Sequence, residues 1–323
     1  MLPDEMRELR AISERVRTVF ERAGYGEIYT PALEYESVVT AGLRPVGAQP
    51  GATAGDADEA RPAYRVFDEH GDVLALRSDM TLPIARVVAN RYASAEPPLR
   101  FCYLAHAYRG VRPQRGQPRE FLQAGVELIG SPAPEGTAEA LTVLCAALDA
   151  AGLRDYRVGL GYARLYSTLL DSFGVPADAH ERVVNELVKR NFVGLEHELV
   201  RLELGDDAIA LLLRVPQMRG GPDVLDAPPG PVADAVAGIR SVRDLLPPSA
   251  SERVIFDLGL ARGLGYYTGA VFEVYDPALG VPIGGGGRYD ELLARFGRPL
   301  PAVGFALTVE RLHIALTGEE RQA

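Results

Sequence analysis

One stretch of sequence decides the fold: RFCYLAHAYRGVRPQRGQPREFLQAGVELI, at residues 100–129. Two runs rich in aromatic and aliphatic residues, 100–109 and 119–129, flank a connection rich in glycine, proline and arginine. Strand-forming runs on either side of such a turn-rich connection predict an antiparallel β-hairpin. We therefore take this hairpin as the centre around which the rest of the chain is arranged.

The two faces of the hairpin differ in chemistry, because successive side chains of a strand point to opposite faces. The even positions of the second run are apolar: Leu122, Ala124, Val126 and Leu128. The odd positions include Arg119, Gln123 and Glu127, and Arg109 joins them if residue 109 lies opposite residue 119. This polar face is either the floor of a ligand site or the solvated side of an ordinary half-exposed sheet. The pattern leaves both readings open.

Two other segments could attract an anion. Residues 109–119 contain four arginines and no acid, which favours a phosphate or carboxylate but also suits a solvated loop tip. The glycine run 284–287 precedes Arg288 and could cradle a phosphate at a helix N-terminus. Its spacing fits neither common nucleotide-binding motif, so close packing of strands is the favoured interpretation.

The rest of the pattern predicts one α+β domain over residues 1–323. Helical periodicity predicts helices at 4–23, 81–90, 136–151, 163–173 and 284–296, and from Glu310 onward. Strand patterns predict strands at 27–31, 64–68, 73–77, 155–160, 253–258, 266–275 and 302–308. Residues 176–250 are mostly helical and interrupt the strands, so we expect a helical insertion there. Residues 41–63 lack an apolar period and read as a surface loop.

Composition excludes several classes of function. The formal net charge is −10, so no overall basic field would attract nucleic acid or an anionic membrane surface. The five histidines and the cysteines, Cys102 and Cys145, show no metal-ligand spacing, and no nucleophile motif occurs. We expect neither a metal nor a cofactor. No export signal or membrane span is apparent, which favours a cytoplasmic protein.

Several segments together resemble the histidyl form of the class II aminoacyl-tRNA synthetases. Residues 108–123 look like the second signature motif, 24–31 like the first, and 302–312 like the third. Residues 262–273, which begin Arg-Gly-Leu-Gly-Tyr-Tyr, and 286–290, Gly-Gly-Arg-Tyr-Asp, are similar to the two histidine-specific motifs. The match follows family order along nearly the whole chain. It implies an antiparallel sheet flanked by helices and a homodimer formed through the first motif.

The resemblance also implies roles for individual residues. The residues that would line a histidine pocket are Asp79, Thr81, Arg109, Gln123, Glu127, Arg262, Tyr266 and Tyr267. The carboxylates would face the ammonium group, the tyrosines and other polar groups the imidazole, and the arginines the carboxylate. The arginines that match phosphate-stabilising residues of the synthetases are Arg109, Arg262 and Arg311.

Departures from the synthetase pattern point to a relative that does not activate amino acids. Val111 stands where an acidic residue would accept from adenine, and Gln117 where an arginine would bind phosphate. Gly265 replaces an aspartate, and Asp79 a glutamate. These changes imply that the phosphate-binding arginines are vestigial. The chain also ends soon after the third motif, so we expect no anticodon-binding domain and no tRNA partner.

Residues 76–81 and 123–128 instead resemble the regulatory subunits of short-form ATP phosphoribosyltransferase. That family is non-catalytic and assembles with a separate catalytic subunit in the first step of histidine biosynthesis. The resemblance implies that histidine binds the synthetase-like pocket and biases the arrangement of the complex, which requires a preference for one state. Two alternatives stay open: a histidine-activating synthetase paralogue, and an RNA-binding fragment of a synthetase, against which the acidic charge argues.

Overall fold

The computed structural model describes residues 2–43, 64–110, 118–226, 230–262 and 265–322. Most of the expected surface loop at 41–63 lies outside the described residues, as does the arginine-rich loop at 111–117 with Val111 and Gln117. The hairpin strands on either side of that second loop are described.

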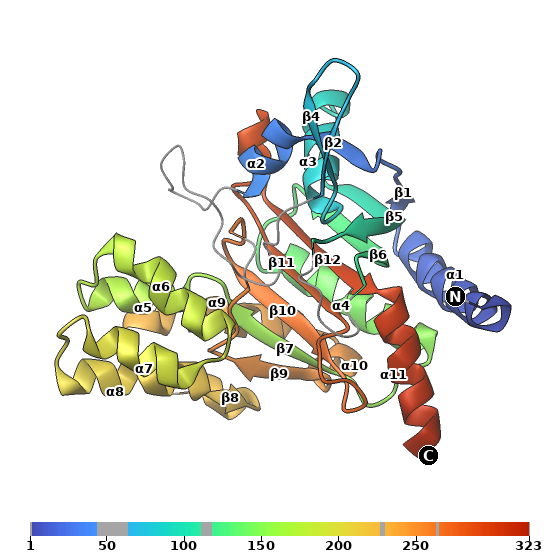
Figure 1. Cartoon of the computed structure of the whole chain (residues 1–323). Coiled ribbons are helices and arrows are strands. Elements are labelled where there is room, and N and C mark those ends of the chain that lie inside the picture. Colours follow the sequence, from blue (N-terminus) through green and yellow to red (C-terminus); the bar gives the residue numbers. More distant parts are fainter. Residues whose placement is uncertain (1, 44–63, 111–117, 227–229, 263–264, 323) are drawn as a thin grey trace.

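A nine-stranded sheet forms the centre of the molecule (Figure 1). In spatial order its strands are β1 (Gly26–Glu27), β5 (Leu99–Tyr108), β6 (Glu120–Ile129), β12 (Ala302–Thr308), β11 (Gly284–Arg288), β10 (Ala270–Tyr275), β7 (Arg157–Tyr162), β9 (Val254–Asp257) and β8 (Arg219–Gly220). The strands from β5 to β7 pair antiparallel, which confirms the predicted synthetase-like α+β fold.

Two pairings near the edges, β1 with β5 and β7 with β9, are parallel, and the sequence patterns did not reveal them. Parallel neighbours require a long crossover connection. The chain supplies one in each case, through residues 28–98 and 163–253.

Three helices cover the apolar face of the hairpin: α1 (Pro3–Arg22), α4 (Glu135–Ala151) and α11 (Val309–Gln322). Helix α1 is amphipathic and buries Leu9, Ile12, Val16 and Phe20. These side chains share one core cluster with Ala124, Val126 and Leu128. The even positions of β6 therefore face the main core, as predicted. No helix in the described ranges has the length and apolar character needed to cross a bilayer.

The opposite face of the hairpin is covered by a second, smaller cluster. It includes residues of α2 (Glu36–Leu43), β4 (Val73–Leu76), α3 (Thr81–Arg91) and the 3-10 turn η4 (Leu293–Phe296). Strand β4 lies between β2 (Leu33–Tyr35) and β3 (Arg65–Phe67) in a three-stranded sheet. Met80, Ile84 and Val88 from the α3 region pack there with Tyr103 of β5 and Tyr289. Gln123 and Glu127, on the polar face of the hairpin, are therefore enclosed between the sheet and this cluster, whereas Arg119 of the same face is exposed.

Between β7 and β9 the chain is mainly helical and forms a lobe at the left of Figure 1. The elements of this segment are α5 (Leu165–Ser172), α6 (Ala177–Val188), α7 (Phe192–Val200), α8 (Asp206–Arg214), η1 (Val215–Gln217), β8, η2 (Pro222–Leu225), η3 (Gly230–Val232) and α9 (Ala233–Leu245). It ends in α10 (Pro248–Ser251), which packs on α4 outside the lobe. Leu195, Leu199 and Leu212 of this lobe belong to the main core cluster, so the helices pack on the sheet domain.

The predicted helix at 284–296 is wrong. Residues 284–288 form strand β11, and only Leu293–Phe296 form a 3-10 turn. A glycine run has no side-chain periodicity from which to distinguish the two structures. The neighbouring strands decide: a Cβ atom on Gly286 would lie 2.0 Å from the carbonyl oxygen of Gly304 in β12. Close strand packing, the favoured interpretation, is confirmed.

Candidate ligand-binding site

The hairpin register places the predicted polar residues on one face. Tyr108 pairs with Glu120, and the backbone N–H of Arg109 donates to the carbonyl of Arg119 at 2.9 Å. Residue 109 is thus opposite residue 119, which meets the condition under which Arg109 was expected on the polar face. Gln123 and Glu127 share this face but are only 4% and 1% exposed, which rules out a solvated sheet surface at these two positions.

Glu127 lies at the centre of a buried hydrogen-bond network. The hydroxyl of Thr81 donates to Oε1 of Glu127 at 2.7 Å, and the hydroxyl of Tyr289 donates to Oε2. Burial raises the pKa of Glu127 to about 8, and the nearby Asp79 carboxylate adds to the rise while the two hydroxyl donors oppose it. A Cβ atom on Gly304 would lie 1.9 Å from Oε2, so the absence of a side chain there makes room for the carboxylate.

Asp79 is the second buried acid of the cluster. It lies in the turn that leads into α3, where its Oδ1 accepts the backbone N–H of Leu82 at 3.1 Å. Burial raises the pKa of Asp79, while this hydrogen bond and the positive charge of Arg109 lower it. The ion pairs formed among the described residues include neither Asp79 nor Glu127. Two buried carboxylates without an ion-pair partner form a site that attracts a cation.

Arg262, Tyr266 and Tyr267 form an aromatic wall beside Asp79 and Glu127. Nη1 of Arg262 donates to the carbonyl of Phe272 at 3.0 Å, and the guanidinium lies 5.6 Å from the ring centre of Tyr267. The ring of Tyr266 is buried, 4.9 Å from that of Tyr267 and 5.8 Å from that of Tyr289.

The glycines of β11 leave space for this wall. A Cβ atom on Gly285 would lie 2.0 Å from Nη1 of Arg262, and one on Gly287 would lie 2.9 Å from Cδ1 of Tyr267. The glycine run therefore shapes the site by leaving room for the side chains of Arg262 and Tyr267. It lies in a strand and not at a helix N-terminus that could hold a phosphate.

Within the described part of the chain, two buried polar atoms of the site lack a hydrogen-bond partner: Nε of Arg109 and Oε1 of Gln123. The guanidinium of Arg109 lies 4.9 Å from the ring centre of Phe121. Leaving such an atom unsatisfied costs about 1–3 kcal/mol. A buried donor and a buried acceptor on one sheet face, beside two carboxylates, complement a ligand that carries both an anionic and a cationic group.

The structure does not bring every predicted residue into this network. Arg311 lies in the first turn of α11, where Nη1 donates to the carbonyl of Pro282 at 2.7 Å. No hydrogen bond described above joins it to the carboxylates. Tyr289, in contrast, contacts Glu127 directly but was not predicted as a site residue. Its position in the Gly-Gly-Arg-Tyr-Asp motif was the available signal.

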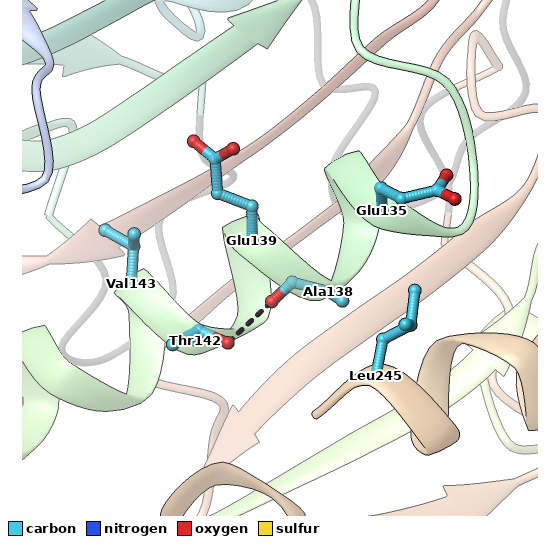
Figure 2. A pocket seen from close by; sticks show the side chains of 6 residues that line it. All are labelled: Glu135, Ala138, Glu139, Thr142, Val143 and Leu245. Carbon is cyan, nitrogen blue, oxygen red and sulfur yellow. Dashed lines mark hydrogen bonds between the residues drawn. The ribbon is translucent and has the colours of Figure 1, made fainter. Parts of the chain in front are cut away.

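A separate depression of about 340 Å³ lies along α4 and is lined by Glu135, Ala138, Glu139, Thr142, Val143 and Leu245 (Figure 2). Glu139 is already bound by Arg100, at 2.8 and 2.9 Å, and by the hydroxyl of Tyr25 at 3.0 Å. The depression shares no residue with the candidate site.

Comparison with known proteins decides the family. The sequence model for histidyl-tRNA synthetase matches residues 1–312. A protein named ATP phosphoribosyltransferase regulatory subunit from Symbiobacterium thermophilum is 40% identical, over 97% of this chain and 77% of its own length. The chain belongs to the histidyl-tRNA synthetase-like family of ATP phosphoribosyltransferase regulatory subunits.

Other members of this regulatory-subunit family agree. The regulatory subunit of Desulforamulus reducens is 38% identical, over 98% of this chain and 77% of its own length. The crystal structure of an "ATP phosphoribosyltransferase regulatory subunit/histidyl-tRNA synthetase" from Bacillus halodurans superposes with a TM-score of 0.86 at 32% identity. The superposition covers 97% of this chain and 80% of the Bacillus halodurans chain. The family resemblance predicted from the motifs is thereby confirmed.

Proposed function

We propose that this chain binds histidine between the hairpin and α3 and, as a non-catalytic regulatory subunit, adjusts the activity of a short-form ATP phosphoribosyltransferase catalytic subunit. The observation that carries the proposal is a buried set of polar groups: the Asp79 and Glu127 carboxyl groups, which form no ion pair among the described residues, and Oε1 of Gln123 and Nε of Arg109, which lack a hydrogen-bond partner there. Each has a matching group on histidine.

The ligand groups can be assigned by charge. Asp79 and Gln123 supply acceptors for the ammonium group, while Arg109 and Arg262 supply donors for the carboxylate. Glu127 offers a hydrogen-bonding group to the imidazole ring. Around the ring lie the aromatic side chains Tyr266, Tyr267 and Tyr289. In this assignment Thr81 orients Glu127, and Arg311 plays no part in histidine binding.

A buried arginine supports transmission from this site to the surface. Nε of Arg77 donates to the carbonyl of His106 at 2.8 Å, and its Nη1 donates to Pro31 at 3.2 Å and also to Thr30. Arg77 therefore connects the two ends of this path. Along the chain it is two residues from Asp79, and its partner Thr30 is next to Tyr29, whose side chain is 79% exposed at the surface. A shift of the turn that holds Asp79 would thus move the first-motif segment, through which we also propose that the chain forms a homodimer. Regulation requires histidine to prefer one arrangement by about 1–3 kcal/mol.

The test mixes the purified chain with the short catalytic subunit of the same organism and follows phosphoribosyl-ATP formation with and without histidine. Activity or histidine sensitivity that depends on the mixture supports the proposal. Replacing Glu127 by alanine should raise the histidine concentration for half-inhibition about tenfold or more, because a buried charged hydrogen bond contributes about 1.5–3 kcal/mol. Glu196→Ala, at an exposed position of α7, is the matched control and should leave inhibition unchanged. An unaltered inhibition curve for Glu127→Ala would count against this pocket.

A second candidate is a histidine-activating synthetase paralogue. Retention of Arg109, Arg262 and Arg311, together with the histidyl-tRNA synthetase match, favours it. Histidine-dependent exchange of pyrophosphate into ATP by this chain alone would support this candidate over the regulatory one.

A further inference from the structure

Arg262, one of the two arginines proposed to bind the carboxylate of histidine, is held from two sides. Its Nη1 donates to the carbonyl of Phe272 at 3.0 Å, and its Nε lies 4.0 Å from Oε1 of Glu273 on β10. The side chains of Arg262 and Glu273 are only 9% and 13% exposed, so water and salt screen this charge pair little. The position of Glu273 therefore helps to set the orientation of the Arg262 guanidinium.

Glu273 is bonded in turn by Tyr275, which lies two residues further along β10 on the same face. The hydroxyl of Tyr275 donates to Oε2 of Glu273, and Nη2 of Arg190 donates to the hydroxyl oxygen of Tyr275 at 2.9 Å. Because a guanidinium can only donate, the single hydroxyl hydrogen of Tyr275 is directed to Glu273. A chain of contacts thus runs from Arg190 through Tyr275 and Glu273 to Arg262.

The outer end of this chain of contacts lies in the helical lobe. Arg190 directly follows the end of α6 and has a φ of 54°, in the left-handed region. The N–H groups of Arg190 and Asn191 donate to the carbonyls of Leu187 and Glu186, both at 2.9 Å. Helices that end in this arrangement usually have glycine at the left-handed position, because a side chain is strained there. The backbone alone therefore favours glycine, whereas the contact with Tyr275 requires the arginine.

A second arginine of the lobe reaches the same tyrosine. The guanidinium of Arg219 on β8 lies 5.3 Å from the ring centre of Tyr275, and its Nε lies 3.7 Å from Oδ2 of Asp257 on β9. A Cβ atom on Gly159 of β7 would lie 3.1 Å from Cε2 of Tyr275, so this glycine leaves room for the ring. Tyr275 is thus a point at which the lobe contacts the strand that carries Glu273.

We propose that Arg190, Tyr275 and Glu273 are positioning residues that orient Arg262 toward the carboxylate of histidine and thereby couple the helical lobe to the ligand. This inference rests on the proposed function. Because the chain of contacts ends at Arg262, it acts on the carboxylate of the ligand and not on its ammonium or imidazole group. The coupling is reciprocal, so a bound carboxylate also favours the arrangement of the lobe in which Arg190 contacts Tyr275.

The experiment compares histidine with histidinol, in which a hydroxymethyl group replaces the carboxylate, by calorimetric titration of the full chain. Tyr275→Phe keeps the ring and removes the hydroxyl, whereas Arg190→Gly removes the side chain and relieves the backbone strain. Each variant should bind histidine about three- to tenfold more weakly, the effect of one hydrogen bond. Each should bind histidinol with the affinity of wild type.

Glu203→Gly is the matched control for Arg190→Gly. Glu203 lies between α7 and α8 and also has a left-handed backbone, with a φ of 53°, but its side chain forms no hydrogen bond or ion pair with any other described residue. The substitution relieves the same kind of strain without removing a contact. It should change the affinity for neither ligand.

The double variant Arg190→Gly/Tyr275→Phe tests whether the two residues act in series. It should lose no more histidine affinity than Tyr275→Phe alone, because loss of the hydroxyl already interrupts the chain of contacts. Additive losses, or equal losses for histidine and histidinol, contradict the positioning role. Unaltered histidine affinity in both single variants overturns the inference and leaves the proposed function standing. Absence of histidine binding to the wild-type chain overturns both.

Discussion

Gly304 of β12 is the position where a single added methyl group should damage the site most directly. A Cβ atom there would lie 1.9 Å from Oε2 of Glu127 and 2.6 Å from the carbonyl oxygen of Val126 on the neighbouring strand. Because the second contact is with backbone, rotation of the Glu127 side chain cannot relieve the whole clash. Gly304→Ala should therefore lower the free energy of unfolding by about 1–3 kcal/mol, the usual cost of overpacking a core.

The same substitution should weaken histidine binding. Displacement of Glu127 would disturb its hydrogen bonds with Thr81 and Tyr289, and loss of about 1.4 kcal/mol of ligand interaction corresponds to a tenfold weaker affinity. Urea denaturation and calorimetric titration with histidine measure the two effects separately.

Gly280→Ala is the matched control, because a Cβ atom at Gly280 would meet no heavy atom within 4 Å. It should change neither quantity. The reasoning fails if Gly304→Ala unfolds within about 0.5 kcal/mol of wild type, the range typical of surface substitutions, and binds histidine with unaltered affinity.

Three further outcomes are expected. The raised pKa of Glu127 should make the free energy of unfolding fall as pH rises from about 5 to 8, and urea denaturation should show a flatter profile for Glu127→Gln. Glu139→Gln should lose about 1–2 kcal/mol, because it weakens the bidentate contact with Arg100; equal stability in urea would show that the pair contributes nothing. Arg77→Lys retains the charge but not the geometry of several simultaneous hydrogen bonds, so in the mixed assay it should reduce the maximal inhibition by histidine more than it reduces histidine affinity.

Local pattern was enough for the elements that face the main core. The alternation of residues 119–129 predicted which side chains of β6 are buried there, and the period of 4–23 predicted α1 within one residue at each end. Alternation did not fix the register; it predicted that Arg109 shares the face of Arg119 if the two residues are opposite, and the structure meets that condition. These features depend on side-chain spacing along one or two adjacent segments, which the sequence displays directly.

Other features depended on partners that are distant along the chain. The glycine run 284–287 has no side chains to show a period, and only its position between β10 and β12 makes it a strand. The parallel pairing of β1 with β5 and of β7 with β9 likewise depends on where the chain returns after long crossovers.

For the candidate site as well, some features could be predicted from the sequence and others arose only from the tertiary structure. Residue types and motif order by themselves indicated the family and most of the side chains of the buried polar cluster around Glu127. Only the tertiary structure decided that Gln123 and Glu127 on the polar face of the hairpin are buried, because the α3 region and Tyr289 cover them. Thr81 and Tyr289 reach Glu127 from 46 and 162 residues away. Burial and neighbouring charge set the protonation of Glu127, and both arise from contacts that no local pattern records.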